Sequence, residues 1–132
     1  MVTLIYLTIE TRQNTDALLV TSRQATLDAD LGYLSNVIDY PELGIGRGVP
    51  GETEEEVRVM ALLISYLRIR EFAWFQYQNG ILDETTWQSY ISPTPLVFAL
   101  PESREILNGY RGDPEFIAYV RELLRERPSD PQ

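Results

Sequence analysis

The segment RIREFAWFQYQNG, residues 68–80, places charged side chains directly against aromatic ones. Arg68 and Glu71 are the residues in it that could act on a ligand, because a carboxylate can serve as a general base while a guanidinium anchors an anion. Tyr77 and the neighbouring aromatic rings would then form the walls of a pocket. The simpler interpretation is a structural ion pair, since a carboxylate on a packed helix face requires an arginine or several hydrogen-bond donors.

The composition removes most of the chemistry that such a site would use. The chain of 132 residues contains no Cys and no His, and its 11 basic residues are all Arg. Histidine-based triads, thiolate nucleophiles, zinc centres and lysine Schiff bases are therefore excluded, and we expect no metal and no cofactor. A formal net charge of −9 also disfavours nucleic acid and anionic lipid headgroups as partners.

The apolar spacing predicts an all-α protein, a small helical bundle that forms one domain over residues 1–132. A first long helix covers residues 2–39, with Gly32 as the place where it could bend. A loop rich in Gly and Pro follows at residues 40–51 and reverses the chain. Residues 128–132 form a frayed tail.

A second long helix begins after Thr53, which we expect to cap it together with Glu56 three residues later. The acidic run at residues 54–56 suits the positive end of the helix dipole, although a cation site is the alternative interpretation. The helix continues to Asn79, which precedes a glycine and is a typical C-terminal stop. The two long helices therefore form an antiparallel pair.

Two or three shorter helices are expected to pack against this pair. Asp83 caps the first of them, which is broken by the prolines at residues 92–95. The apolar piece at residues 96–100 is a strand or one helical turn, and we favour the turn because no partner strand is visible. Pro101 begins the next helix, and Asp113 caps the last one.

Helical phasing places Glu71 on the apolar stripe of the second long helix and Arg68 at its margin. The first helix has polar interruptions of its own stripe at Arg23 and Gln24. We predict a polar layer between the two helices, in which Glu71 pairs with Arg68 or Arg23. Gln24 or Gln78 completes the network, which fixes the helix register more than it adds stability.

The N-terminal end, residues 1–10, lacks the polar face of an ordinary surface helix. Its apolar residues are Val2, Leu4, Ile5, Tyr6, Leu7 and Ile9. This stretch is far shorter than the ~20 residues that span a bilayer, and it has no features of a signal peptide. Either a partner buries these turns, or they are the lower end of a longer hydrophobic helix.

Three motifs resemble those of a group of small bacterial proteins of uncharacterised activity. The first is VxLIYLxxxxRxNTxAL at residues 2–18. The second is RxRExxWxQYxxGxLDExxW at residues 68–87, and the third is DPxFxxYV at residues 113–120. The resemblance covers most of the chain, and the middle motif is the most specific.

Members of that group carry an N-terminal transmembrane helix followed by a small helical domain. The resemblance thus implies that residues 2–9 end a membrane helix. We expect Met1 to be either a start inside that helix or the start of a shorter variant. Arg12, directly after the apolar stretch, favours an inner membrane-associated protein with the domain on the cytoplasmic side. The resemblance implies no activity.

Two functions remain open. The leading hypothesis is a non-enzymatic accessory or interaction domain, membrane-anchored in its parent form. It would self-associate as a homo-oligomer, or join a membrane complex as a protein partner, through the apolar N-terminal helix. The alternative is a small-molecule-binding domain or an enzyme, with a pocket formed by Arg68, Glu71 and Tyr77.

Overall fold

The computed structural model describes residues 2–126, and the predicted tail at 128–132 lies outside them. The helices are α1 (Val2–Asp39), α2 (Glu54–Gln78), α3 (Glu84–Ile91), α4 (Thr94–Val97), α5 (Pro101–Gly109) and α6 (Pro114–Glu126), with a short 3-10 helix, η1, at Pro41–Leu43. No strand occurs within residues 2–126, so the predicted all-α class is confirmed.

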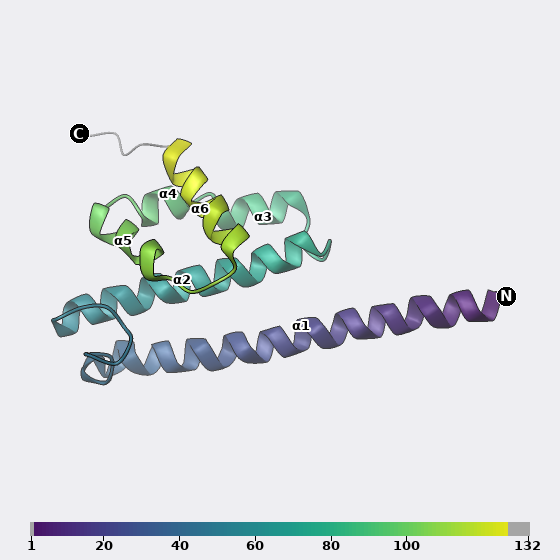
Figure 1. Ribbon diagram of the computed structural model, residues 1–132, viewed down its shortest axis with the longest axis horizontal. Coiled ribbons are helices and arrows are strands. Elements are labelled where there is room, and N and C mark those ends of the chain that lie inside the picture. Colours follow the sequence, from purple (N-terminus) through teal and green to yellow (C-terminus); the bar gives the residue numbers. More distant parts are fainter. Residues whose placement is uncertain (1, 127–132) are drawn as a thin grey trace.

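The helices form layers around α2 (Figure 1). α1 lies antiparallel along one side of α2, and the shorter helices α3 to α6 lie on its other side. The predicted antiparallel pair with shorter C-terminal helices is therefore the observed architecture. Of the apolar piece at residues 96–100, only the first two residues lie in the single-turn α4, which begins two residues earlier than predicted, at Thr94, and ends at Val97.

The starts of α2, α3 and α6 carry the caps that the sequence predicts. Thr53 Oγ1 accepts a hydrogen bond from the Glu56 N–H, and the Glu56 carboxylate accepts one from the Thr53 N–H, both at 3.2 Å. Asp83 and Asp113 accept backbone N–H groups at the starts of α3 and α6. Gly80, with φ of 71°, follows the end of α2. These local hydrogen bonds explain why the element boundaries could be predicted closely.

The loop between α1 and α2 depends on glycine. Gly46, Gly48 and Gly51 have φ values of 69°, 97° and 134°, which side chains rarely adopt. Gly44 has an ordinary φ, but a Cβ there would lie 2.7 Å from the side chains of Val37 and Val57. The loop can therefore pack directly onto both long helices.

Two hydrophobic cores share α2. The larger one lies between α2 and the shorter helices, and its fully buried side chains include Leu67, Trp87, Ile91, Phe98, Phe116 and Val120. The smaller one joins α1, the loop and α2, and it consists of Leu34, Val37, Val49, Val57 and Ala61. α2 is therefore the element on which both cores depend.

Only the C-terminal half of α1 packs against the rest of the domain. Residues 2–19 are all exposed, Val20 is partly buried, and Leu34 and Val37 are buried. The helix continues without interruption through Gly32 and extends well beyond the end of α2 (Figure 1). We refer to residues 2–19 as the projecting half of α1.

Gly32→Ala is expected to raise the melting temperature, because Gly32 is exposed and an added Cβ would meet no atom within 4 Å. Alanine is favoured over glycine inside a helix by about 0.5–1 kcal/mol. Gly44→Ala is expected to lower the melting temperature, because overpacking against buried valines costs about 1–3 kcal/mol. Thermal unfolding followed by circular dichroism compares the two variants. Shifts of the same sign would contradict the described packing of the loop.

Candidate functional site

Glu71 lies in α2 with its side chain 20% exposed, and both of its oxygens are occupied. Oε2 accepts the hydroxyl of Tyr110 at 2.5 Å, and Oε1 accepts the backbone N–H of Asp113 at 2.8 Å. Arg68 Nη1 lies 3.6 Å from Oε2. Because Tyr110 and Asp113 belong to the connection between α5 and α6, the carboxylate ties α2 to the C-terminal part of the chain.

Gly112 brings this connection close to the carboxylate. A Cβ at Gly112 would lie 2.5 Å from Glu71 Oε2 and 2.5 Å from Tyr110 Cε1. Such distances are far below van der Waals contact, so a side chain here would push the loop away from Glu71. Gly112 and Tyr110 are the residues of this site that sequence reasoning missed. The sequence signal was a glycine directly before the predicted cap of α6.

Arg68 links Glu71 and Tyr110 to α1. Its Nε lies 3.4 Å from the Asp30 carboxylate of α1, and its guanidinium lies 4.9 Å from the centre of the Tyr110 ring. Arg68 thus contacts α1 on one side of α2 and the α5–α6 connection on the other. A planar guanidinium suits this position because it can pair with carboxylates and stack on a ring at the same time.

The other members of the predicted polar layer lie elsewhere, and this part of the prediction is corrected. Arg23 lies over the ring of Phe75 at 3.7 Å and makes no ion pair with Glu71 among the described residues. Gln24 donates a hydrogen bond to Asp28 on its own helix. Gln78, near the end of α2, is exposed. Phasing identified the face of Glu71 but could not tell that its donors come from the α5–α6 connection.

Tyr77 does not join Arg68 and Glu71 in one pocket. Its hydroxyl donates to the Glu84 carboxylate, and its ring stacks on Trp87 at 5.6 Å with an interplanar angle of 13°. Trp74 extends this aromatic cluster toward Phe116, with a centroid separation of 6.3 Å. Because Trp87 and Phe116 are buried, the rings serve as core packing between α2, α3 and α6.

The chemistry available at Glu71 is therefore limited. A general base needs a lone pair that can reach a substrate proton, whereas both oxygens of Glu71 already accept hydrogen bonds. The hollow beside it, between α1 and α2, has a volume of about 210 Å³ and is lined by residues that include Arg23, Leu27 and Phe72. Within the described part of the chain, no group of three or more acidic residues is placed to hold a metal ion.

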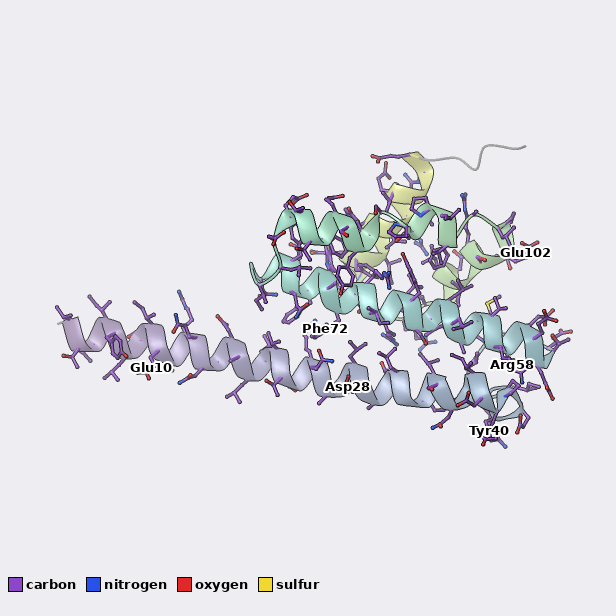
Figure 2. All side chains as sticks on the ribbon, turned by 180° about the vertical axis from the view of Figure 1, so that it is seen from behind. Glu10, Asp28, Tyr40, Arg58, Phe72 and Glu102 are labelled. Atoms are coloured by element: carbon purple, nitrogen blue, oxygen red, sulfur yellow. The ribbon has the colours of Figure 1, made fainter. Side chains whose placement is uncertain are left out.

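The projecting half of α1 is the second candidate site. Figure 2 shows side chains on all sides of the helix around Glu10, with no other helix beside them. Val2, Leu4 and Tyr6 are 83%, 69% and 65% exposed. Among residues 2–126, no helix combines the length and the apolar character needed to cross a bilayer.

Comparisons with protein-family models, with curated proteins and with solved structures find no match. The resemblance based on the three motifs therefore stays a prediction.

Glu71→Gln and Glu71→Leu test the structural role of the carboxylate. Both are expected to lower the melting temperature, and leucine more so, because it leaves Tyr110 and the Asp113 N–H without an acceptor. An unsatisfied buried donor costs about 1–3 kcal/mol. Glu122→Gln is the matched control, since Glu122 forms an exposed ion pair with Arg125 and such pairs contribute about 0–1 kcal/mol. If both Glu71 variants melt like the wild type, the structural role is wrong.

Alkaline pH tests Tyr110. Burial, together with its hydrogen bond to Glu71, raises the pKa of the Tyr110 hydroxyl far above its usual value. In the unfolded chain this group ionises at its ordinary pKa of about 10. The stability that it contributes is therefore complete below about pH 10 and is lost as the pH rises further. We expect the free energy of unfolding, measured with urea, to fall less steeply above about pH 10 in Tyr110→Phe than in the wild type. Tyr6→Phe, on the projecting half of α1, is the control, and its free energy of unfolding should fall as steeply as that of the wild type. If the free energy of unfolding falls equally steeply with pH in the wild type and in both variants, Tyr110 does not contribute in this way.

Proposed function

We propose that this protein is a non-enzymatic interaction domain, membrane-anchored in its parent form, that self-associates or joins a membrane complex through the projecting half of α1. The observation that carries the proposal is the complete exposure of residues 2–19 on a helix that extends beyond the domain (Figure 1). Within it, the apolar side chains of residues 2–9 form a contiguous surface of the kind that is typical of an interaction site.

The apolar side chains lie on all sides of the helix. At 100° per residue, the six large side chains Val2, Leu4, Ile5, Tyr6, Leu7 and Ile9 leave no polar stripe wide enough to face water. A single packed helix would cover one side and leave the other side exposed. Lipid, or several neighbouring helices, would cover the whole circumference. This favours a membrane or a membrane complex over a simple pairwise contact.

The Thr8 hydroxyl in this stretch is already satisfied. Thr8 Oγ1 donates to the Leu4 carbonyl at 2.8 Å, so this hydroxyl adds no unpaired donor to an apolar environment. Threonine is tolerated in membrane helices for the same reason. The polar run from Glu10 to Asp16 follows. At 1.5 Å per residue this run is about 10 Å long, and it lies between the apolar stretch and the domain.

The alternative function, a pocket at Arg68, Glu71 and Tyr77, receives less support. Each oxygen of Glu71 already accepts a hydrogen bond, and Tyr77 packs in the aromatic cluster on a different part of α2. Localisation at the inner membrane, with the domain on the cytoplasmic side, remains part of the proposal through Arg12, which follows the apolar stretch.

The double variant Leu4→Gln/Leu7→Gln tests the proposal. Light scattering in detergent-free buffer is expected to give the wild type a mass above the monomer value of 15.2 kDa. Flotation is expected to show affinity for phosphatidylcholine vesicles, which carry no net charge. Both properties should be lost in the double variant, because the apolar surface is what drives association.

Leu96→Gln/Leu100→Gln is the matched control. These two leucines are 80% and 65% exposed, compared with 69% and 51% for Leu4 and Leu7. They lie in the C-terminal part of the domain, so their loss should change neither mass nor vesicle binding. A wild-type protein that is a clean monomer without affinity for vesicles or detergent would refute the proposal.

A further inference from the structure

A cleft of about 740 Å³ opens between the layers at the loop end of the long helices. Its walls come from α1, the α1–α2 loop, α2, α5 and the start of the α5–α6 connection. We refer to it as the interlayer cleft. Its volume falls within the range of about 300–1,000 Å³ that is usual for small-molecule sites.

The inner surface of the interlayer cleft is apolar. Leu34, Val49 and Ile106 are 5%, 5% and 6% exposed and belong to its lining. Met60 and Ile64 of α2 also belong to the lining. An apolar ligand in the cleft would pack on these side chains, which lie at the edge of the two hydrophobic cores.

Two of the arginines at this cleft have no partner within the described part of the chain. Arg47, in the α1–α2 loop, and Arg111, in the α5–α6 connection, make no ion pair, side-chain hydrogen bond or ring contact among residues 2–126. Most other described arginines are engaged, for example Arg58 with the Ile38 carbonyl and Arg104 with the Phe98 carbonyl. Uncommitted guanidinium groups can pair with an anionic group at short range through charge-assisted hydrogen bonds.

The remaining charges limit the size of that anionic group. Three arginines and four carboxylates line the cleft. Of the carboxylates, Asp30 pairs with Arg68, and Glu56 accepts the N–H groups at the start of α2. Glu102 and Glu105 remain at the α5 rim, where their charges offset those of Arg47 and Arg111, so that the cleft has no excess positive charge for a polyanion. A nucleotide or another polyanion is therefore disfavoured, whereas one acid group is compatible with the site.

We propose that the interlayer cleft binds a small amphipathic organic acid, whose apolar body packs on Leu34, Met60 and Ile106. Its single acid group lies between the guanidinium groups of Arg47 and Arg111. This site differs from the Arg68–Glu71–Tyr77 pocket, because neither Glu71 nor Tyr77 lines it. It is also independent of the projecting half of α1.

Two fluorescent probes of similar shape provide the test. 8-Anilino-1-naphthalenesulfonate carries one negative charge, and N-phenyl-1-naphthylamine is its uncharged counterpart. The wild-type protein should bind the charged probe more tightly. Arg47→Gln/Arg111→Gln should weaken binding of the charged probe by at least about tenfold and leave binding of the neutral probe unchanged, because only the charged probe forms charge-assisted hydrogen bonds with the two guanidinium groups. Both arginines are exposed and unpaired among residues 2–126, so the double variant should fold.

A pair of glycine variants locates the binding. Gly109 lines the cleft, and Gly32 of α1 does not. Both lie in helices without a positive φ, and a Cβ at either would meet no atom within 4 Å. Gly109→Leu should prevent binding of both probes, because its side chain would fill part of the cleft. Gly32→Leu should bind both probes like the wild type. Melting curves check that each variant is folded.

Three results would overturn the proposal. The first is unchanged binding in Gly109→Leu. The second is equal weakening of the charged and the neutral probe in the arginine variant. The third is binding that is lost in Leu4→Gln/Leu7→Gln but retained in Gly109→Leu, because the probes would then occupy the projecting half of α1.

Discussion

The structure depends on how one partly buried carboxylate is satisfied. Glu71 sits on the shared helix α2, and its donors come from the connection that follows α5. Arg68, one turn earlier, reaches across to Asp30 of α1. The same turn of α2 therefore holds the layers on both of its sides. Since a buried carboxylate without donors is costly, the C-terminal helices must stay in register with α2 for the charge to be tolerated.

Arginine performs this connecting role repeatedly along α1 and α2, where the hydrophobic core is small. Arg58 donates to the carbonyl of Ile38 near the end of α1, Arg68 pairs with Asp30, and Arg23 covers the ring of Phe75. Each contact uses a different property of the guanidinium group: its fixed donors, its charge or its planar face. Lysine could replace few of these contacts. A chain whose basic residues are all Arg is thus consistent with an interface held by directional and stacking contacts.

What could be predicted from the sequence follows from the range of each interaction. Caps such as Thr53 with Glu56 act over three residues, so their residue types identify them directly. The apolar face of α2 has a helical period, so Glu71 was assigned to it correctly. Its partners were not, because Tyr110 and Asp113 are about 40 residues away, and periodicity carries no information about which helix faces which. Gly112 is required because a side chain there would collide with Glu71. That constraint arises only when the α5–α6 connection lies against α2.

The projecting half of α1 is the part of the fold that its own contacts explain least. Isolated helices of this length are marginal in water, but this one continues from turns that are packed against α2, so a helical nucleus is already present. Its order should therefore decrease with distance from Val20, the first residue with partial burial. A partner or a membrane that covers Val2 to Ile9 would order the helix from the other end. Binding would then order the whole projecting half of α1, including the polar run from Glu10 to Asp16. It would also fix the position of the domain relative to the partner or membrane.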